Sequence, residues 1–183
     1  MPKRVYKIKL QTMSTSVTTE ESITGKTVFI KMALSAWETY NDRVNKLINT
    51  LTDQQLLADT SPDRNSGIYL FGHLIAISDG LFPILGFGER LYPQLDKIFL
   101  ENPDKSGFEL PSINDLKEYW KIVNTRLTGH INQMPDNEWF SRHTKVSEAD
   151  FANEPHRNKL NIIINRTNHT SYHLGQMAYL EKK

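Results

Sequence analysis

The segment from Asn65 to Leu85 most constrains the fold, because it would be apolar almost all the way round a helix. A helix without a polar face is stable in water only when other helices surround it. The segment contains His73, Asp79 and Pro83, and its longest uncharged run is shorter than the roughly 20 residues that a membrane span needs. We therefore predict the central helix of a bundle, with a continuous apolar surface formed by Ile68, Tyr69, Leu70, Phe71, Leu74, Ile75, Ile77, Leu81 and Phe82.

Three further segments place apolar residues three or four positions apart, which is the period of a helix packed on one side. They cover Thr27–Leu51, Ser112–Met134 and Pro155–Lys182. Ser112 followed by Asp115 is typical of a helix N-terminus, where an acidic side chain interacts favourably with the dipole. Proline fits the first turn of a helix, so Pro155 favours a helix start there. These segments supply three more long helices.

The helices are joined by long connections. Gly86 and Gly88 end the central helix, and the proline-containing stretch 86–111 predicts a long connection with one helical turn near Leu95–Leu100. A second irregular stretch covers 135–154. The predicted fold is all-α, an up-and-down four-helix bundle with long connections. It occupies residues 25–183 as a single domain.

Composition narrows the chemistry that this domain can perform. The chain has 183 residues, no cysteine and a net charge of +1. Without cysteine it forms no disulfide, thiolate metal site or cysteine nucleophile. The near-neutral charge argues against a protein that coats nucleic acid or an acidic membrane. Any chemistry must come from His, Asp, Glu, Tyr or Ser, or from a bound cofactor.

Residues 1–24 are expected to be a flexible or edge-strand appendage to the domain. Their first ten positions hold four basic residues and no acid, but no apolar run follows, so they do not form a secretory signal. A serine- and threonine-rich tract comes next. We expect a cytoplasmic protein.

Two histidines of the last helix stand out because His169 and His173 are four positions apart, on one face of the helix. They lie beside its core stripe, and two such rings are close enough to share one metal ion. Ordinary hydrogen bonds at a bundle edge would also satisfy them. His73, in the middle of the most apolar helix, completes a set of three imidazoles with an open fourth position, the pattern of a catalytic divalent metal.

The other polar candidates are assigned lesser roles. We expect His130 to complement the C-terminus of its helix, and His143 and His156 to be exposed. Gln176 is predicted to contact substrate or to support a metal ligand. Five residues either line the mouth of a pocket or simply pack: Trp37, Tyr40, Tyr69, Arg166 and Tyr172.

The sequence resembles the DinB-like superfamily of four-helix bundles, which includes the bacillithiol- and mycothiol-dependent transferases. The resemblance covers the chain from about residue 25 to its end. It rests on Trp37, the Gly72-His73-Leu74 segment, Pro111-Ser112, and most specifically the His169-to-Gln176 stretch, which reads His, three residues, His-x-Gly-Gln. The resemblance implies a divalent metal, nickel or zinc, held by the histidines at 73, 169 and 173.

Several functions are compatible with such an ion. It could activate water in a hydrolase, or hold a small-molecule thiol as thiolate in a transferase; because the chain has no cysteine, that thiol would be a cosubstrate. A non-catalytic metal-containing stress-response or interaction module is the alternative. We expect a small-molecule substrate, no nucleic acid and no membrane. Aromatic residues predicted on outer faces, Phe29, Tyr119 and Trp120, favour a homodimer.

Overall fold

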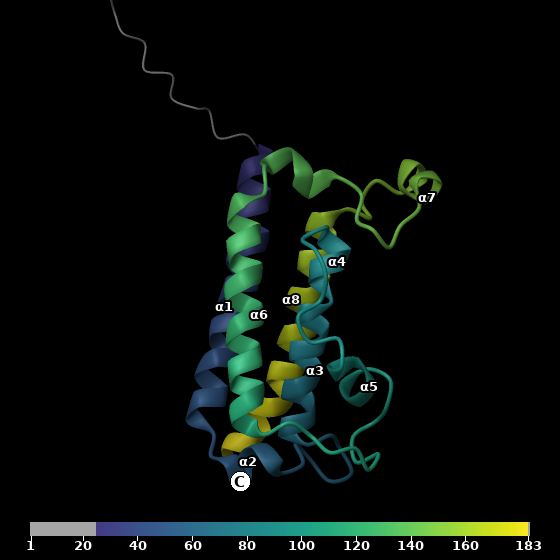
Figure 1. Ribbon diagram of the computed structural model, residues 1–183. Coiled ribbons are helices and arrows are strands. Elements are labelled where there is room, and N and C mark those ends of the chain that lie inside the picture. The colour runs from purple at the N-terminus through teal and green to yellow at the C-terminus, as the bar shows by residue number, and fades with distance from the viewer. Residues whose placement is uncertain (1–24, 183) are drawn as a thin grey trace, which may run out of the picture.

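The computed structural model describes residues 25–182, and within this range every helix or strand assigned is a helix (Figure 1). Four long helices form the body: α1 (Gly25–Thr50), α3 (Gly67–Asp79), α6 (Ile113–Gln133) and α8 (Lys159–Met177). The predicted all-α bundle is confirmed. The expectations for residues 1–24 lie outside the described residues.

Helix α3 is the centre of the bundle, as its composition predicts. It packs against α6 on one side and α8 on the other, and α1 packs along α8. Figure 1 shows α1 and α6 running beside the α3–α8 pair. Ten of the thirteen residues of α3 are buried, so its apolar surface is covered on all sides. The short helix α4 (Leu81–Leu85) continues from it, and Gly86 ends α4 in the left-handed conformation with φ 82°.

The segment Gly67–Leu85 is long and apolar enough to cross a membrane by length and composition, with a mean hydropathy of 1.6. In the folded protein 72% of that window is buried. The packing of α3 and α4 inside the bundle therefore accounts for the apolar character of the segment.

Local side-chain caps set the helix boundaries and explain where the sequence-based boundaries were wrong. The Ser112 hydroxyl accepts a hydrogen bond from the Asp115 amide (3.1 Å), so this predicted start is confirmed. The last long helix begins at Lys159 instead of Pro155, because the Asn158 side chain accepts from the Asn161 amide (3.0 Å) and takes the N-cap position. The continuous central helix predicted to Leu85 is instead divided at Gly80.

Short helices lie in the connections. The predicted turn near Leu95–Leu100 is α5 (Leu95–Phe99). The stretch predicted to be irregular, 135–154, holds the 3-10 helix η1 (Asp136–Phe140) and α7 (Glu148–Asn153), which projects from the upper part of the body in Figure 1. Two more short elements close the opposite end of the bundle near the C-terminus: α2 (Asp53–Leu57) and the 3-10 helix η2 (Ala178–Lys182).

Helix α5 packs directly on the middle of α3. A Cβ atom at Gly72 would lie 2.3 Å from the Phe99 ring, and Phe99 is fully buried. Only a residue without a side chain permits this approach. The close contact brings the backbone of α5 to the turn of α3 that carries His73.

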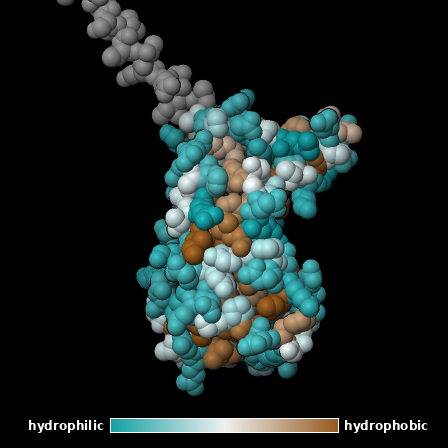
Figure 2. All heavy atoms as spheres, in the orientation of Figure 1, coloured by the Kyte–Doolittle hydropathy of each residue, from teal (hydrophilic) through white to brown (hydrophobic). Residues whose placement is uncertain are grey.

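Two of the three aromatic residues predicted on outer faces are not free. Trp120 is 3% exposed and donates its indole N–H to the Asn45 side chain (2.6 Å), which contradicts the expected exposed position. Tyr119 stacks on Tyr92 with ring centroids 4.2 Å apart. Phe29 on α1 is 49% exposed, as expected. In Figure 2 hydrophilic residues cover much of α6, and apolar atoms are visible between α6 and α8.

Candidate metal centre

The three histidines that the sequence singles out lie together between α3 and α8. The Nε2 atom of His169 is 3.3 Å from Nε2 of His73 and 3.0 Å from Nε2 of His173. One nitrogen from each ring lies within 4.8 Å of the others, and all three rings are half-buried. The i, i+4 spacing on α8 places two of the rings on one face, and α3 brings the third opposite them.

The backbone of α5 orients His73. Nδ1 of His73 donates its hydrogen to the carbonyl oxygen of Phe99 at 2.8 Å, so the Nε2 lone pair is directed to the other two histidines. The ring of Tyr69 lies nearly parallel to the imidazole, with centroids 6.5 Å apart. Tyr69 is fixed in turn by donating its hydroxyl hydrogen to the Asn102 carbonyl at 2.7 Å. The orientation of His73 thus depends on the connection between the long helices.

A side chain of α8 itself orients His173. Nδ1 of His173 donates to Oε1 of Gln176 at 2.7 Å, and Nε2 of Gln176 donates to the exposed Tyr172 hydroxyl at 3.3 Å. Gln176 therefore selects the tautomer of His173 whose Nε2 is unprotonated. This is a contact with a candidate ligand, one of the two roles that the sequence suggested for Gln176.

His169 lacks a comparable partner. Its Nδ1 atom is buried and makes no hydrogen bond with any residue in the range 25–182. Burial, together with smaller contributions from His173, His73 and Arg166 in that order, lowers the pKa of His169 to about 4. Burial also lowers the pKa of His73 and that of His173. All three rings are therefore neutral near pH 7, the form in which imidazole binds a metal.

The donor set fits a divalent metal ion. With His73 and His173 protonated on Nδ1, both of their Nε2 atoms are acceptors, and the single hydrogen of His169 can serve only one of them. A cation among the three lone pairs removes that conflict. In a tetrahedral site with bonds of 2.0–2.1 Å, ligand nitrogens lie about 3.3 Å apart, close to the two separations found here.

The remaining histidines lie away from this cluster. His143, expected to be exposed, is only 7% exposed, and its Nδ1 accepts from the Lys145 amide at 3.2 Å. The amide of the adjacent Thr144 donates to the Ile84 carbonyl (3.1 Å), which holds this part of the connection against α4. His156 is exposed as expected. His130 lies in the last turn of α6, where its ring stacks on Phe87 with centroids 4.8 Å apart.

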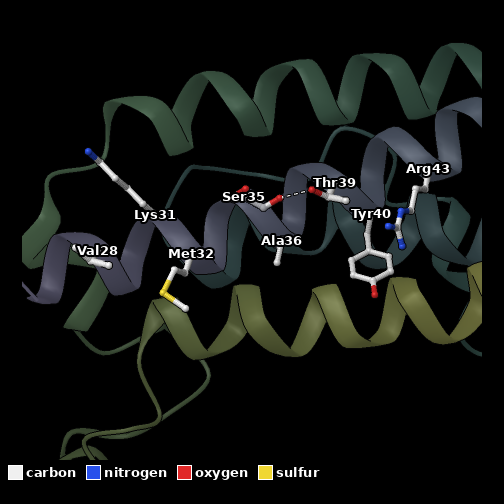
Figure 3. Close-up of a pocket in the computed structure, with 8 residues that line it drawn as sticks. All are labelled: Val28, Lys31, Met32, Ser35, Ala36, Thr39, Tyr40 and Arg43. Atoms are coloured by element: carbon white, nitrogen blue, oxygen red, sulfur yellow. Dashed lines mark hydrogen bonds between the residues drawn. The ribbon is translucent and has the colours of Figure 1, made fainter.

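The pocket-lining residues suggested by the sequence do not form one pocket. Trp37 is 4% exposed and belongs to the core, and Tyr69 is also buried. Tyr40 instead contributes to a pocket of about 670 Å³ lined only by α1 residues, where the Arg43 guanidinium lies over its ring (Figure 3). None of the triad histidines lines that pocket. Arg166, in contrast, is on α8 one turn before His169.

Comparison with known proteins agrees with the geometry. A family model described as the DinB superfamily matches residues 36–177, which include all three histidines and Gln176. A crystal structure of a conserved protein from Enterococcus faecalis covers 82% of this chain and 93% of its own, with a TM-score of 0.57 and 13% sequence identity. At that identity the likeness concerns the fold alone. No curated protein matches the chain.

Proposed function

We propose that this chain, which belongs to the DinB superfamily, binds one divalent metal ion through His73, His169 and His173 and uses it in catalysis on a small molecule. The observation that carries the proposal is the convergence of three neutral Nε2 atoms, two of them with their Nδ1 hydrogens already directed away from the centre. Such an arrangement satisfies three lone pairs only when a cation is present.

Each residue around the centre has a defined task in this proposal. The Phe99 carbonyl and the Gln176 amide hold the hydrogens of His73 and His173 on Nδ1. His169 supplies the third neutral nitrogen. Bound by three neutral ligands, the ion would keep its full charge and so acidify a water molecule or a thiol.

The reaction follows from which small molecule is activated. Activated water corresponds to a hydrolase, and an activated thiol to an S-transferase. Since the chain has no cysteine, the thiol of a transferase would be a low-molecular-weight cosubstrate. Imidazole suits zinc, nickel, copper and iron alike, and the resemblance to the DinB superfamily favours nickel or zinc among them.

Elemental analysis of the freshly purified protein, made without a histidine tag, tests the metal site. One equivalent of nickel or zinc is expected for wild type, with none in His169→Ala. The exposed His156 provides a matched control, since His156→Ala removes one imidazole away from the cluster and should keep the metal. Wild-type protein that binds no divalent ion when nickel, zinc, iron or manganese is supplied would exclude the proposal.

Turnover assays separate the two reactions. The metal-loaded protein is offered a panel of esters and amides, and separately a thiol with an electrophile. Hydrolysis that needs the metal assigns a hydrolase, and thiol consumption that needs the metal assigns a transferase. A loaded protein inert in both panels would contradict the catalytic part of the proposal and leave a metal-binding module.

The homodimer remains a prediction, with less support than the sequence offered. Of its three aromatic residues only Phe29 is exposed, although Val28 and Met32 on the same helix are also exposed, at 44% and 64% (Figure 3). Light scattering at micromolar concentration should report twice the 21.1 kDa chain mass. A mass of one chain would show that the prediction is wrong.

A further inference from the structure

Arg166, on the helix of His169 and His173, is a half-buried cation for which the described residues offer no partner. Its Nε atom is buried and makes no hydrogen bond with the part of the chain that the structure describes. None of the ion pairs found among those residues includes it. A charged group removed from water in this way is costly unless something pairs with it.

Two other largely covered cations are paired. Arg90, whose side chain is 18% exposed, contacts the carboxylates of Asp79 and Asp96. Lys159, at 15%, lies 2.9 Å from Glu138. At these two positions the chain supplies an acidic partner, whereas Arg166 has none among the described residues.

Arg166 lies on the same helix as two of the three clustered histidines. It precedes His169 by three positions, and residues at this spacing share a helix face with Cβ atoms about 5–6 Å apart. The positive charge of Arg166 lowers the pKa of both His169 and His73, so the guanidinium acts on rings from both helices. Its five donors are arranged to bind two oxygens of one anion.

The charges around the site also favour an anionic ligand. Three neutral imidazoles would leave a bound ion with its double positive charge, and Arg166 adds a third. No carboxylate of residues 25–182 is among the groups that shift the pKa values of His73, His169 or Arg166. A neutral ligand would leave this concentration of positive charge without compensation, whereas an anion would offset it.

We propose that Arg166 binds an anionic oxygen group, a carboxylate or a phosphate, of the small molecule whose reacting atom lies at the histidine cluster. The inference rests on the proposed metal site and narrows its substrate class. The substrate or cosubstrate would be a small acid that presents its anionic group to Arg166 and its reacting atom to the histidine cluster. A thiol cosubstrate would carry such a group close to its sulfur.

The first experiment needs no metal. The Nε–H resonance of Arg166, assigned by its loss in Arg166→Gln, is followed by NMR in chelator-treated protein during titration with formate and, separately, with inorganic phosphate. A saturable shift with either anion is expected, and the tighter of the two identifies the anion class. Arg126→Gln removes an exposed guanidinium of α6 and should leave the Arg166 shift unchanged. Absence of a saturable shift with both anions overturns the proposal.

The second experiment uses the zinc-loaded protein and calorimetry. Wild type should bind 3-mercaptopropionate about 10–100-fold more tightly than 2-mercaptoethanol, the effect of one hydrogen-bonded charge pair. Arg166→Gln should remove the preference, Arg166→Lys should retain part of it, and Arg126→Gln should retain it fully. Equal binding of both thiols by wild type overturns the proposal while leaving the metal site intact. Failure to load zinc would instead count against the proposed function, and the NMR titration would still decide the role of Arg166.

Discussion

Helix α3 carries Asp79 and His73, six positions apart, and the chain satisfies the hydrogen-bonding groups around the first but not those around the second. Asp79 is fully buried, and its carboxylate accepts hydrogen bonds from the amides of Leu91 and Tyr92 (2.8 and 3.0 Å) and from Nε of Arg90 (3.2 Å). These contacts fasten the connection after α4 to the central helix. Both carboxylate oxygens of Asp79 therefore accept hydrogen bonds from the chain itself.

In the cluster around His73, by contrast, several polar atoms lack a hydrogen-bond partner among the described residues. Two imidazole Nε2 atoms compete for one hydrogen, Nδ1 of His169 has no partner among the described residues, and neither does Nε of Arg166. Since both groups lie on one helix in one core, the difference is not a general looseness of packing. A polar group that serves the fold has partners from the chain, whereas a polar group that binds a ligand leaves room for it.

The Asp79 side of the comparison should give the largest effect. Asp79→Ala leaves two backbone amides and Nε of Arg90 without their acceptor, and breaking a buried ion pair in this way costs about 3–5 kcal/mol. Urea denaturation should show this loss of unfolding free energy equally with and without chelator. The exposed Asp42 is the control, since Asp42→Ala should change stability by no more than about 0.5 kcal/mol. A loss below about 1 kcal/mol for Asp79→Ala would contradict the claim that the contacts of Asp79 stabilise the fold.

The histidine side should give effects that depend on metal. At a free metal concentration of 100 times Kd, binding stabilises the native state by about 2.7 kcal/mol. His169→Ala and His173→Ala should lose this increment, because each destroys the chelating pair on α8. His73→Ala should keep weak binding and also destabilise the metal-free protein by about 1–3 kcal/mol, since the Phe99 carbonyl loses its donor.

Melting temperature with and without chelator measures these three variants together. His156→Ala, which removes an exposed ring, should behave as wild type under both conditions. If chelator leaves the melting temperature of wild type unchanged after metal loading, the cluster is ordinary packing and the comparison collapses.

Gln176→Ala should sharpen the comparison with an intermediate effect. It removes the acceptor that holds the His173 hydrogen on Nδ1, and loss of such a supporting contact typically weakens metal binding about 10–100-fold. Stability in chelator should hardly change, because the side chain is only half-buried. Tyr172→Phe, which removes the exposed hydroxyl beyond Gln176, is the matched control and should bind metal as wild type does. Competition titration with a metal indicator measures the metal affinity of these variants. A Gln176→Ala variant that binds metal as tightly as wild type would contradict the prediction.

The smallest expected effect is the pH dependence of the metal-free protein. The pKa of His169 is about 4 in the folded state and near 6.5 when unfolded, so between these values the unfolded chain binds more protons. The contribution of neutral His169 to the free energy of unfolding should therefore be complete above pH 6.5 and decrease as the pH falls toward 4. His169→Gln should flatten this part of the profile, and His156→Gln should not. Parallel wild-type and His169→Gln profiles would show that the folded pKa of His169 is not lowered.

The sequence predicts the long helices and the histidine cluster well because both depend on local spacing. Apolar residues three and four apart define the helix faces, and His169 and His173 share a face by the same rule. His73 could be added because a polar residue on an apolar helix must face something that tolerates it. The fold class, the caps at Ser112 and the turn at Leu95–Phe99 follow from the same kind of signal.

Features that depend on how the connections fold could not be predicted in this way. The burial of His143, which lies in the loop before α7, is one such feature. The acceptor for His73 is a backbone carbonyl, which has no residue type to recognise. Arg166 could be placed beside His169 by spacing, but its lack of an acidic partner depends on the complete three-dimensional arrangement.

The contact between Gly72 and Phe99 sets a boundary for redesign of this protein. Loops that join bundle helices usually tolerate shortening, since surface connections contribute little to the core. Here the connection after α4 returns to deliver one carbonyl oxygen to His73, and the absence of a side chain at Gly72 makes the docking feasible. A variant with residues 94–103 replaced by a short turn would keep the contacts of Asp79 with residues 90–92 but remove the Phe99 carbonyl. The imidazole of His73 would then lose the acceptor that fixes its tautomer, so metal binding would depend on a segment that looks dispensable.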